Sequence, residues 1–139
     1  MRIYVAGRVG RYLRVRALID DLRDAGHEIT HDWTRNEGFC EDGHPLSTND
    51  QSIPPDRQAR IASDDITGCA AAELIVVIAD EPLCGALIEI GVALANDVPV
   101  WICAPWRWTV FWSHPLVRIL DSEAEVRWLL RETCREEIR

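Results

Sequence analysis

Residues 74–79 read Leu-Ile-Val-Val-Ile-Ala, an uninterrupted apolar run rich in β-branched side chains. Such a run predicts a central strand buried on both faces, because a strand with one solvated face alternates apolar and polar residues. Beyond this run we expect a helix at Gly85–Ala95 and a second buried strand at Val98–Cys103. The order strand, helix, strand predicts a parallel sheet at the centre of the fold.

The same alternation continues on both sides of this central unit. The further elements expected are strands at Ile3–Ala6, Glu28–His31 and Val117–Leu120, a helix closed by Ala25-Gly26, a helix from about Asp56 to Gly68, and a last helix capped by Ser122. This order predicts an α/β fold, a doubly wound (Rossmann- or flavodoxin-like) and mostly parallel sheet of five strands. A length of 139 residues suits a single domain, 1–139, since two separate cores would each be too small.

Composition and charge exclude several classes of function. The chain has 15 Lys+Arg against 23 Asp+Glu, a formal charge of −8, which repels a nucleic-acid backbone. Its apolar runs are shorter than the ~20 residues that cross a bilayer. The amino terminus has neither the apolar segment nor the cleavage site of a signal peptide. We therefore expect a cytoplasmic protein with no nucleic-acid and no membrane partner.

The cysteines predict neither disulfides nor a metal site. The 5 cysteines form no Cys-x-x-Cys pair, and an odd number in an intracellular chain indicates reduced, mostly buried thiols. Cys40 and His44 have the spacing of half a zinc site, but no second ligand pair follows. The four histidines show no metal-ligand spacing either, so no metal is expected.

Function is expected where the strands end, because ligands of such sheets bind beyond the carboxyl ends of the strands. The segments that follow the strands are Gly7–Gly10, Asp32–Thr34, Asp80–Glu89 and Ala104–Ser113. The polar stretch Asn36–Pro55 is expected to be a lid over the site, with solvated surface as the alternative.

Glu89 is the leading candidate for chemistry. It falls in or just after the first turn of the helix that Gly85 begins, among apolar neighbours. Partial burial raises the pKa of such a carboxyl, whereas the helix dipole favours the anion. The result would be an ionised but poorly solvated carboxylate, suited to attack a cationic carbon. The alternative is a glutamate that complements the dipole or pairs with an arginine. Asp65 is the second candidate acid, with an ordinary helix-surface charge as its alternative.

The loop after the first strand predicts contact with a sugar or an anion. Gly7-Arg8-Val9-Gly10 is an incomplete Gly-x-Gly-x-x-Gly pattern, so it is weak evidence for a dinucleotide. Glycine still lets backbone N–H groups approach a ligand. Arg8 and Arg11 either hold a phosphate or offset neighbouring acids.

Aromatic residues crowd one carboxyl-terminal segment that includes Trp106, Trp108 and Trp112. Such density indicates a core or a subunit interface, with a stacking platform for a base as the alternative. Trp33, next to Asp32 after the second strand, is the better single candidate for stacking on a base.

Taken together, three segments resemble the nucleoside 2-deoxyribosyltransferase family, in particular its 2′-deoxynucleoside 5′-monophosphate N-glycosidase branch. The segments are Ile3-Tyr4-Val5-Ala6-Gly7, Asp65-Ile66 ahead of 72–77, and Gly85–Ala95 running into Val98-Pro99-Val100. The resemblance implies a small-molecule nucleoside or nucleotide as ligand, a homodimer or larger homo-oligomer, and no cofactor.

The resemblance also implies roles by position. Glu89 matches the nucleophile that attacks the anomeric carbon, Asp65 an acid near the leaving base, and Tyr4 a tyrosine that orients the nucleophile. The loop of Gly7, Val9 and Gly10 matches the segment around the sugar and phosphate. Ser113 matches a serine that the neighbouring subunit of a dimer offers to the phosphate. Leu83 lies where the phosphate-using branch carries a serine, which leaves Arg8 or Arg11 as replacement phosphate ligands.

The function expected from the sequence is cleavage or transfer at the N-glycosidic bond of a nucleoside or nucleotide. A carboxylate under the anomeric carbon stabilises the positive charge that develops there and can trap it covalently. The first alternative is a hydrolase of ribonucleotides or NAD. The second is a non-catalytic nucleotide-sensing module on the same fold, and the third is a structural partner protein that uses the tryptophan-rich segment.

Overall fold

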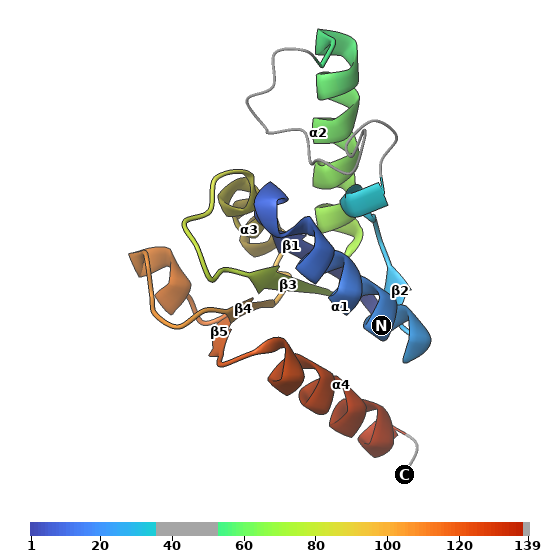
Figure 1. Cartoon of the computed structure of the whole chain (residues 1–139). Helices are drawn as coiled ribbons and strands as arrows, with labels where there is room; N and C mark the ends of the chain where they lie inside the picture. The colour runs from blue at the N-terminus through green and yellow to red at the C-terminus, as the bar shows by residue number, and fades with distance from the viewer. Residues whose placement is uncertain (36–52, 138–139) are drawn as a thin grey trace.

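A five-stranded parallel sheet forms the centre of the computed structural model, which describes residues 1–35 and 53–137 (Figure 1). Its strands are β1 (Arg2–Gly7), β2 (Glu28–Ile29), β3 (Leu74–Ile78), β4 (Val100–Cys103) and β5 (Val117–Leu120). They lie in the order β2-β1-β3-β4-β5, and every neighbouring pair is parallel. This is the flavodoxin-like order, so the predicted doubly wound α/β fold is confirmed.

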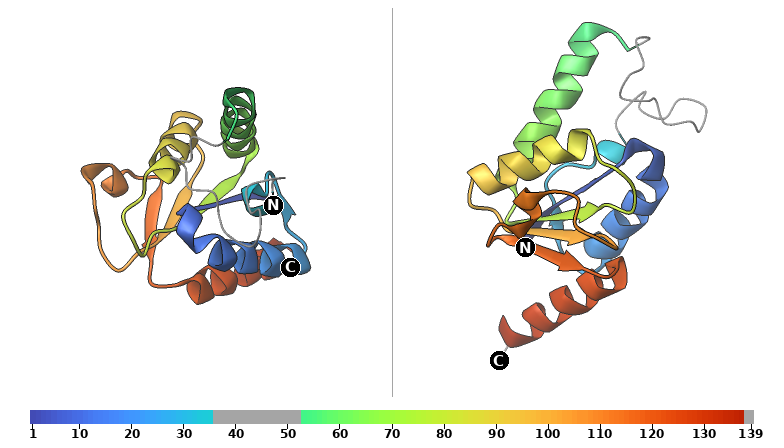
Figure 2. Two further views of the ribbon diagram at one scale, coloured as in Figure 1. Left: turned by 45° about the horizontal axis from the view of Figure 1, so that its top comes forward. Right: turned by 90° about the vertical axis from the view of Figure 1, so that its left-hand side faces the viewer.

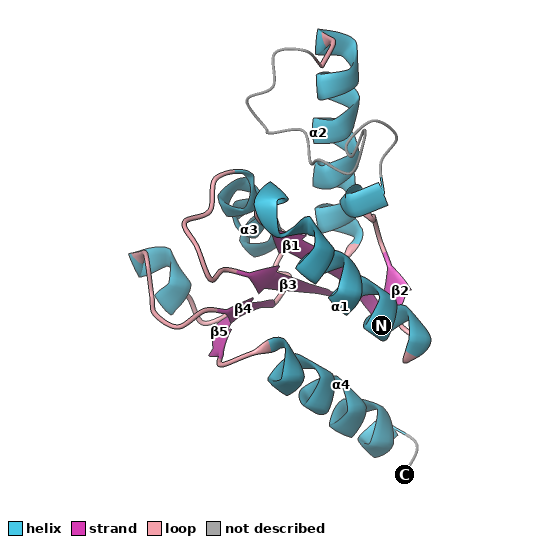
Figure 3. Cartoon of the chain, in the orientation of Figure 1, coloured by secondary structure: helices cyan, strands magenta, loops and turns pink. Residues whose placement is uncertain are grey.

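Helices cover both faces of the sheet. They are α1 (Tyr12–Asp24), α2 (Pro55–Ala71), α3 (Gly85–Ala95) and α4 (Glu123–Glu137), with short 3-10 turns η1 (Val9–Arg11), η2 (Trp33–Arg35) and η4 (Val110–Ser113). Figure 2 shows α1 and α4 on one face and α2 and α3 on the other. The amino-terminal half of α2 projects beyond the sheet, as the view coloured by secondary structure also shows (Figure 3). No helix within the described residues is long and apolar enough to cross a membrane.

The core follows from the apolar pattern. All five residues of β3 are buried, as expected of a central strand covered on both faces. The buried residues of α1 recur at helical spacing, so one stripe of the helix packs on the sheet: Val15, Leu18, Ile19 and Leu22. Each such side chain stabilises the fold by ~1.5–3 kcal/mol relative to its exposed state.

The second strand is shorter than predicted. The sequence predicts a strand over Glu28–His31, but β2 ends at Ile29. One further backbone bond, from Thr30 N to Ile3 O at 3.0 Å, continues the pairing. The chain then leaves the sheet, which lets the His31 side chain approach α2.

Two sequence predictions concern parts of the chain that are described only partly. The predicted lid and the Cys40–His44 pair lie outside the described residues, apart from 53–55 at the end of the lid. Among the cysteines whose state is described, Cys69 and Cys103 are buried and Cys84 is exposed, and all three are free thiols.

Candidate active site

The candidate site is built around a hydrogen bond between β1 and α3. The Tyr4 hydroxyl donates to Glu89 Oε1 at 2.6 Å, across 85 positions of sequence. Tyr4 is fully buried in the interior strand β1, which fixes its ring. Helix α3 begins at Gly85, so Glu89 follows directly after its first turn, flanked by the buried Ala86 and Ile90. The fold therefore directs this carboxylate toward the sheet.

Because of its surroundings, the Glu89 carboxyl is about half-ionised at neutral pH. Burial raises the pKa of Glu89 to about 7, and the negative charge of Asp65 acts in the same direction. The hydrogen bond from Tyr4 and the charge of His31 oppose this rise. Burial also raises the pKa of Tyr4, so its hydroxyl keeps its proton and remains a donor. A carboxylate that is ionised but poorly solvated is a strong nucleophile.

A second polar pair lies beside the first. His31 Nε2 lies 3.3 Å from Asp65 Oδ1, and both side chains are partly exposed. The contact with Asp65 raises the pKa of His31, so this imidazole holds a proton more tightly than a free one. Asp65 also acts on the pKa values of Tyr4 and Glu89, so the two pairs form one electrostatic cluster. The predicted residues Tyr4, Asp65 and Glu89 thus come together, and His31 joins them.

Sequence reasoning missed His31. It has no metal-ligand spacing, and its partner lies 34 positions further along the chain. The available signal was its place at the carboxyl end of the predicted strand Glu28–His31, at the edge of the sheet where ligands bind.

Gly68 allows α2 to approach this cluster. A Cβ atom at this position would lie 2.5 Å from His31 Cβ and 3.2 Å from the ring of Tyr4. A contact of 2.5 Å between carbon atoms is far inside van der Waals distance, so a larger residue would displace the helix that carries Asp65.

The predicted loop after β1 is held by packing and by ion pairs. A Cβ atom on Gly7 would lie 2.7 Å from Val15 Cγ2, so glycine is needed there for close packing of α1. The neighbouring Val9 and Gly10 belong to η1, and Gly10, like Gly85, has open space around it.

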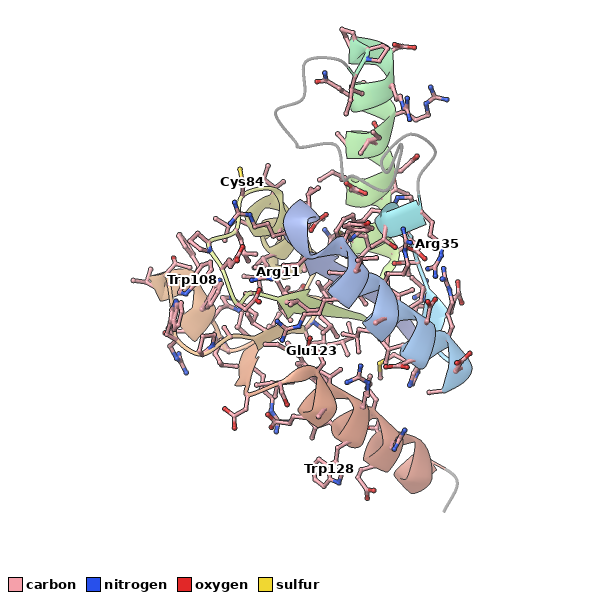
Figure 4. The ribbon with its side chains drawn as sticks, viewed as in Figure 1. Arg11, Arg35, Cys84, Trp108, Glu123 and Trp128 are labelled. Carbon is pink, nitrogen blue, oxygen red and sulfur yellow. The ribbon has the colours of Figure 1, made fainter. Side chains whose placement is uncertain are left out.

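The two arginines of this loop contact acids. Arg8 Nη1 donates to Glu81 Oε2 at 2.9 Å, and Arg11 Nη2 donates to Glu81 Oε1 at 2.6 Å. Arg11 Nε lies 3.3 Å from Asp80 Oδ2 as well. In the view of Figure 4, Arg11 is drawn near the loop that leads to Cys84, and its side chain is partly exposed. Of the two alternatives for these arginines, the structure shows the pairing with neighbouring acids.

The side chains of Asp32 and Trp33 bind other residues of the chain. The Asp32 carboxylate accepts hydrogen bonds from Arg23 and Arg35, at 2.8 and 2.6 Å. Trp33 is only 5% exposed, and its indole N–H donates to Val5 O at 2.8 Å. The ring is part of the core and its donor is satisfied, while stacking of Trp33 on a base stays a prediction.

The carboxyl-terminal aromatic segment forms a stack of its own. Trp106 lies 6.0 Å from Trp108, and Trp108 lies 5.5 Å from Trp112, measured between ring centroids. Ser113 Oγ accepts a hydrogen bond from Arg107 Nη1 at 3.0 Å within the same segment. This segment contacts β5, which β3 and β4 separate from β1. Within one chain, Ser113 is therefore apart from the Tyr4–Glu89 pair.

The described residues contain no group of three or more His, Cys, Asp or Glu side chains that could hold a metal ion. The polar side chains that meet in the candidate site are those of Tyr4, His31, Asp65 and Glu89.

The comparisons with known proteins concern the fold. No family model matches the sequence, and no curated protein matches it either. Among solved structures, the chain is similar to the CMP N-glycosidase BcmB of Clostridium botulinum, with a TM-score of 0.55 and 17% sequence identity. The match covers 94% of this chain and 98% of that one. At this identity, the likeness establishes a shared fold over nearly the whole length of both chains.

Proposed function

We propose that the protein cleaves the N-glycosidic bond of a nucleoside or its 5′-monophosphate, with Glu89 as the nucleophile. The observation that carries this proposal is the partly buried Glu89 carboxyl, hydrogen-bonded to Tyr4 and with a pKa of about 7, beyond the end of a parallel strand. The shared fold with a CMP N-glycosidase supports the same class of reaction.

The first step forms a glycosyl ester. A Glu89 carboxylate oxygen attacks the anomeric carbon while the bond from that carbon to the base nitrogen breaks. The electron pair goes to the base, which takes a proton from the His31–Asp65 pair. The Tyr4 hydroxyl orients the attacking carboxylate through its hydrogen bond to Glu89 Oε1.

The second step releases the sugar. Water attacks the anomeric carbon, the ester bond breaks, and Glu89 regains its carboxylate. The proton of the water returns to the His31–Asp65 pair, which restores the starting state. A second base in place of water would give transfer instead of hydrolysis, because the ester is common to both outcomes.

A panel assay tests this function. The purified protein is incubated with deoxynucleosides, ribonucleosides, their 5′-monophosphates and NAD, and free base is measured by chromatography. We expect base release from at least one nucleoside or monophosphate without an added cofactor. Binding without release from any compound would contradict the proposal and favour the nucleotide-sensing module.

The pH dependence of kcat/KM should follow the Glu89 carboxyl. Because the Glu89 anion is the active form, the rising limb of the kcat/KM profile should have its inflection near pH 7, and kcat/KM should fall again at higher pH as the His31–Asp65 pair loses the proton that it gives to the base. Replacing Tyr4 by phenylalanine removes the hydrogen bond that lowers the pKa of Glu89, so the inflection should move to higher pH. The control is Tyr12→Phe, the other tyrosine of the chain, which should leave the profile unchanged. A Tyr4→Phe profile identical to that of the unaltered protein would contradict this account.

We also propose that two copies associate through apolar side chains of α3 and η4. Ile88 is 64% exposed and Phe111 is 70% exposed, with Leu87 and Val110 exposed beside them in sequence. Helix α3 has no charged residue other than Glu89, so its exposed apolar side chains suit a contact between two copies of the chain.

Sedimentation of matched variants tests this association. We expect a dimer for the unaltered protein and a monomer for Ile88→Glu, because a buried unpaired carboxylate opposes association. The control, Leu13→Glu, changes an exposed leucine of α1 on the opposite face of the sheet and should remain a dimer. A monomeric unaltered protein at micromolar concentration would contradict the proposal.

A further inference from the structure

Glu81 bridges two arginines at the carboxyl edge of the sheet, where β1 and β3 end. Each of its carboxylate oxygens accepts a hydrogen bond from a different guanidinium, Arg8 on one side and Arg11 on the other. The register of the sheet explains this contact. Gly7, the last residue of β1, is paired with Ile78, the last of β3, so the two chains leave the sheet side by side.

The bridge belongs to a larger cluster whose charges balance. Arg14 extends it, with Nη1 donating to Asp80 Oδ2 at 2.8 Å and its other nitrogens bonded to Glu123. The cluster has three arginines against three carboxylates: Arg8, Arg11 and Arg14 with Asp80, Glu81 and Glu123. The chain has no lysine, so its basic side chains other than histidine are all arginines.

This arrangement leaves little attraction for an added anion. Two guanidinium groups at a loop next to a sugar site would ordinarily hold a phosphate. Here a carboxylate already occupies them, and Leu83, two residues further on, is an apolar side chain packed against the core. A phosphate dianion at this position would either lie beside the Glu81 carboxylate, where like charges repel, or have to compete with Glu81 for the two guanidinium groups.

We propose that Glu81 is a specificity-determining residue that occupies Arg8 and Arg11 in place of a substrate phosphate, so that the site selects an unphosphorylated nucleoside. This inference rests on the proposed function and names the substrate class of the same site. The selected substrate has a neutral 5′-hydroxyl, which faces an ion cluster without net charge and meets no like-charge repulsion.

Steady-state kinetics on one matched pair of substrates tests this role. The nucleoside that releases its base best in the panel is compared with its own 5′-monophosphate, in the unaltered protein and in Glu81→Gln. We expect the unaltered protein to prefer the nucleoside by about tenfold or more in kcat/KM. Glu81→Gln should raise the ratio of monophosphate to nucleoside kcat/KM by about tenfold, since it keeps the size of the side chain and removes its charge.

The matched control is Glu73→Gln. Glu73 is also an exposed glutamate paired with an arginine, Arg2, but it lies before β3, at the opposite end of the strand from Glu81. Its replacement should leave the substrate ratio unchanged.

The outcomes separate this inference from the proposed function. A preference of the unaltered protein for the monophosphate, or an unchanged ratio in Glu81→Gln, would overturn the selectivity and leave base cleavage in place. Loss of activity on both substrates in Glu81→Gln would also overturn it, because Glu81 would then support the loop itself. No base release by the unaltered protein from any panel compound would contradict the proposed function, and the selectivity would fall with it.

Discussion

Replacing Glu89 by glutamine should lower the rate of base release by about a thousandfold or more. The amide cannot form a stable glycosyl ester, so the two-step route is closed. Glutamine keeps the length of the side chain and offers an oxygen that can still accept the hydrogen bond from Tyr4. The measurement is kcat/KM for the best panel substrate, with Glu73→Gln as an exposed glutamate control that should keep full activity.

The same variant should be more stable than the unaltered protein at alkaline pH. The Glu89 carboxyl has its ordinary pKa of 4.5 in the unfolded chain and about 7 in the folded one. The folded state therefore binds more protons between these values, and its stability falls as pH rises through this window. Glutamine does not ionise, so Glu89→Gln avoids a cost of about 3 kcal/mol above the window. Thermal melts should show little difference at pH 4 and a higher Tm for the variant at pH 8.

These two measurements together separate chemistry from folding. A variant that is inactive and also melts at a lower temperature at every pH has lost structure, and its inactivity says nothing of a nucleophile. An active Glu89→Gln would contradict the mechanism directly.

Replacing Asp65 by asparagine should lower kcat/KM by about a hundredfold or more for natural bases, because general acid catalysis contributes about 10²–10⁴-fold. The change removes the Asp65 carboxylate, which lies 3.3 Å from His31 Nε2 and favours the protonated form of His31. The matched control is Asp64→Asn, which changes the exposed neighbouring residue on the same helix. That variant should keep nearly full activity.

The leaving group identifies the role of Asp65. A deoxyriboside with a nitrophenolate leaving group needs no proton to depart, so Asp65→Asn should lose much less activity on it than on a natural nucleoside. Equal losses on both substrates would mean that Asp65 supports the position of Glu89 instead of assisting the leaving base.

The fold was predictable because each of its elements has a local pattern. The buried run of β3 and the stripe on α1 need only their own sequence to be recognised. Glu89 was predictable for the same reason, since a polar residue just inside the helix that follows a central strand must lie near the carboxyl edge of the sheet.

The contacts of the site depend on packing between distant segments. The His31–Asp65 pair requires the close approach of α2 at Gly68, and nothing near His31 in sequence indicates it. The Glu81 bridge likewise depends on the register of β1 with β3. Core packing of Trp33 is a further contact of this kind, because its place after a strand indicates a ligand contact and gives no sign that its ring packs in the core.

Mass spectrometry of the protein with a slow, 2′-fluorinated nucleoside tests the central claim most directly. Such a compound destabilises the positive charge at the anomeric carbon, and it should release its base and leave the sugar on the enzyme. We predict an added mass equal to one sugar, located by peptide mapping on Glu89 and absent from Glu89→Gln. Release of base with the sugar adduct on another residue, or with no adduct at any time, would contradict Glu89 as the nucleophile.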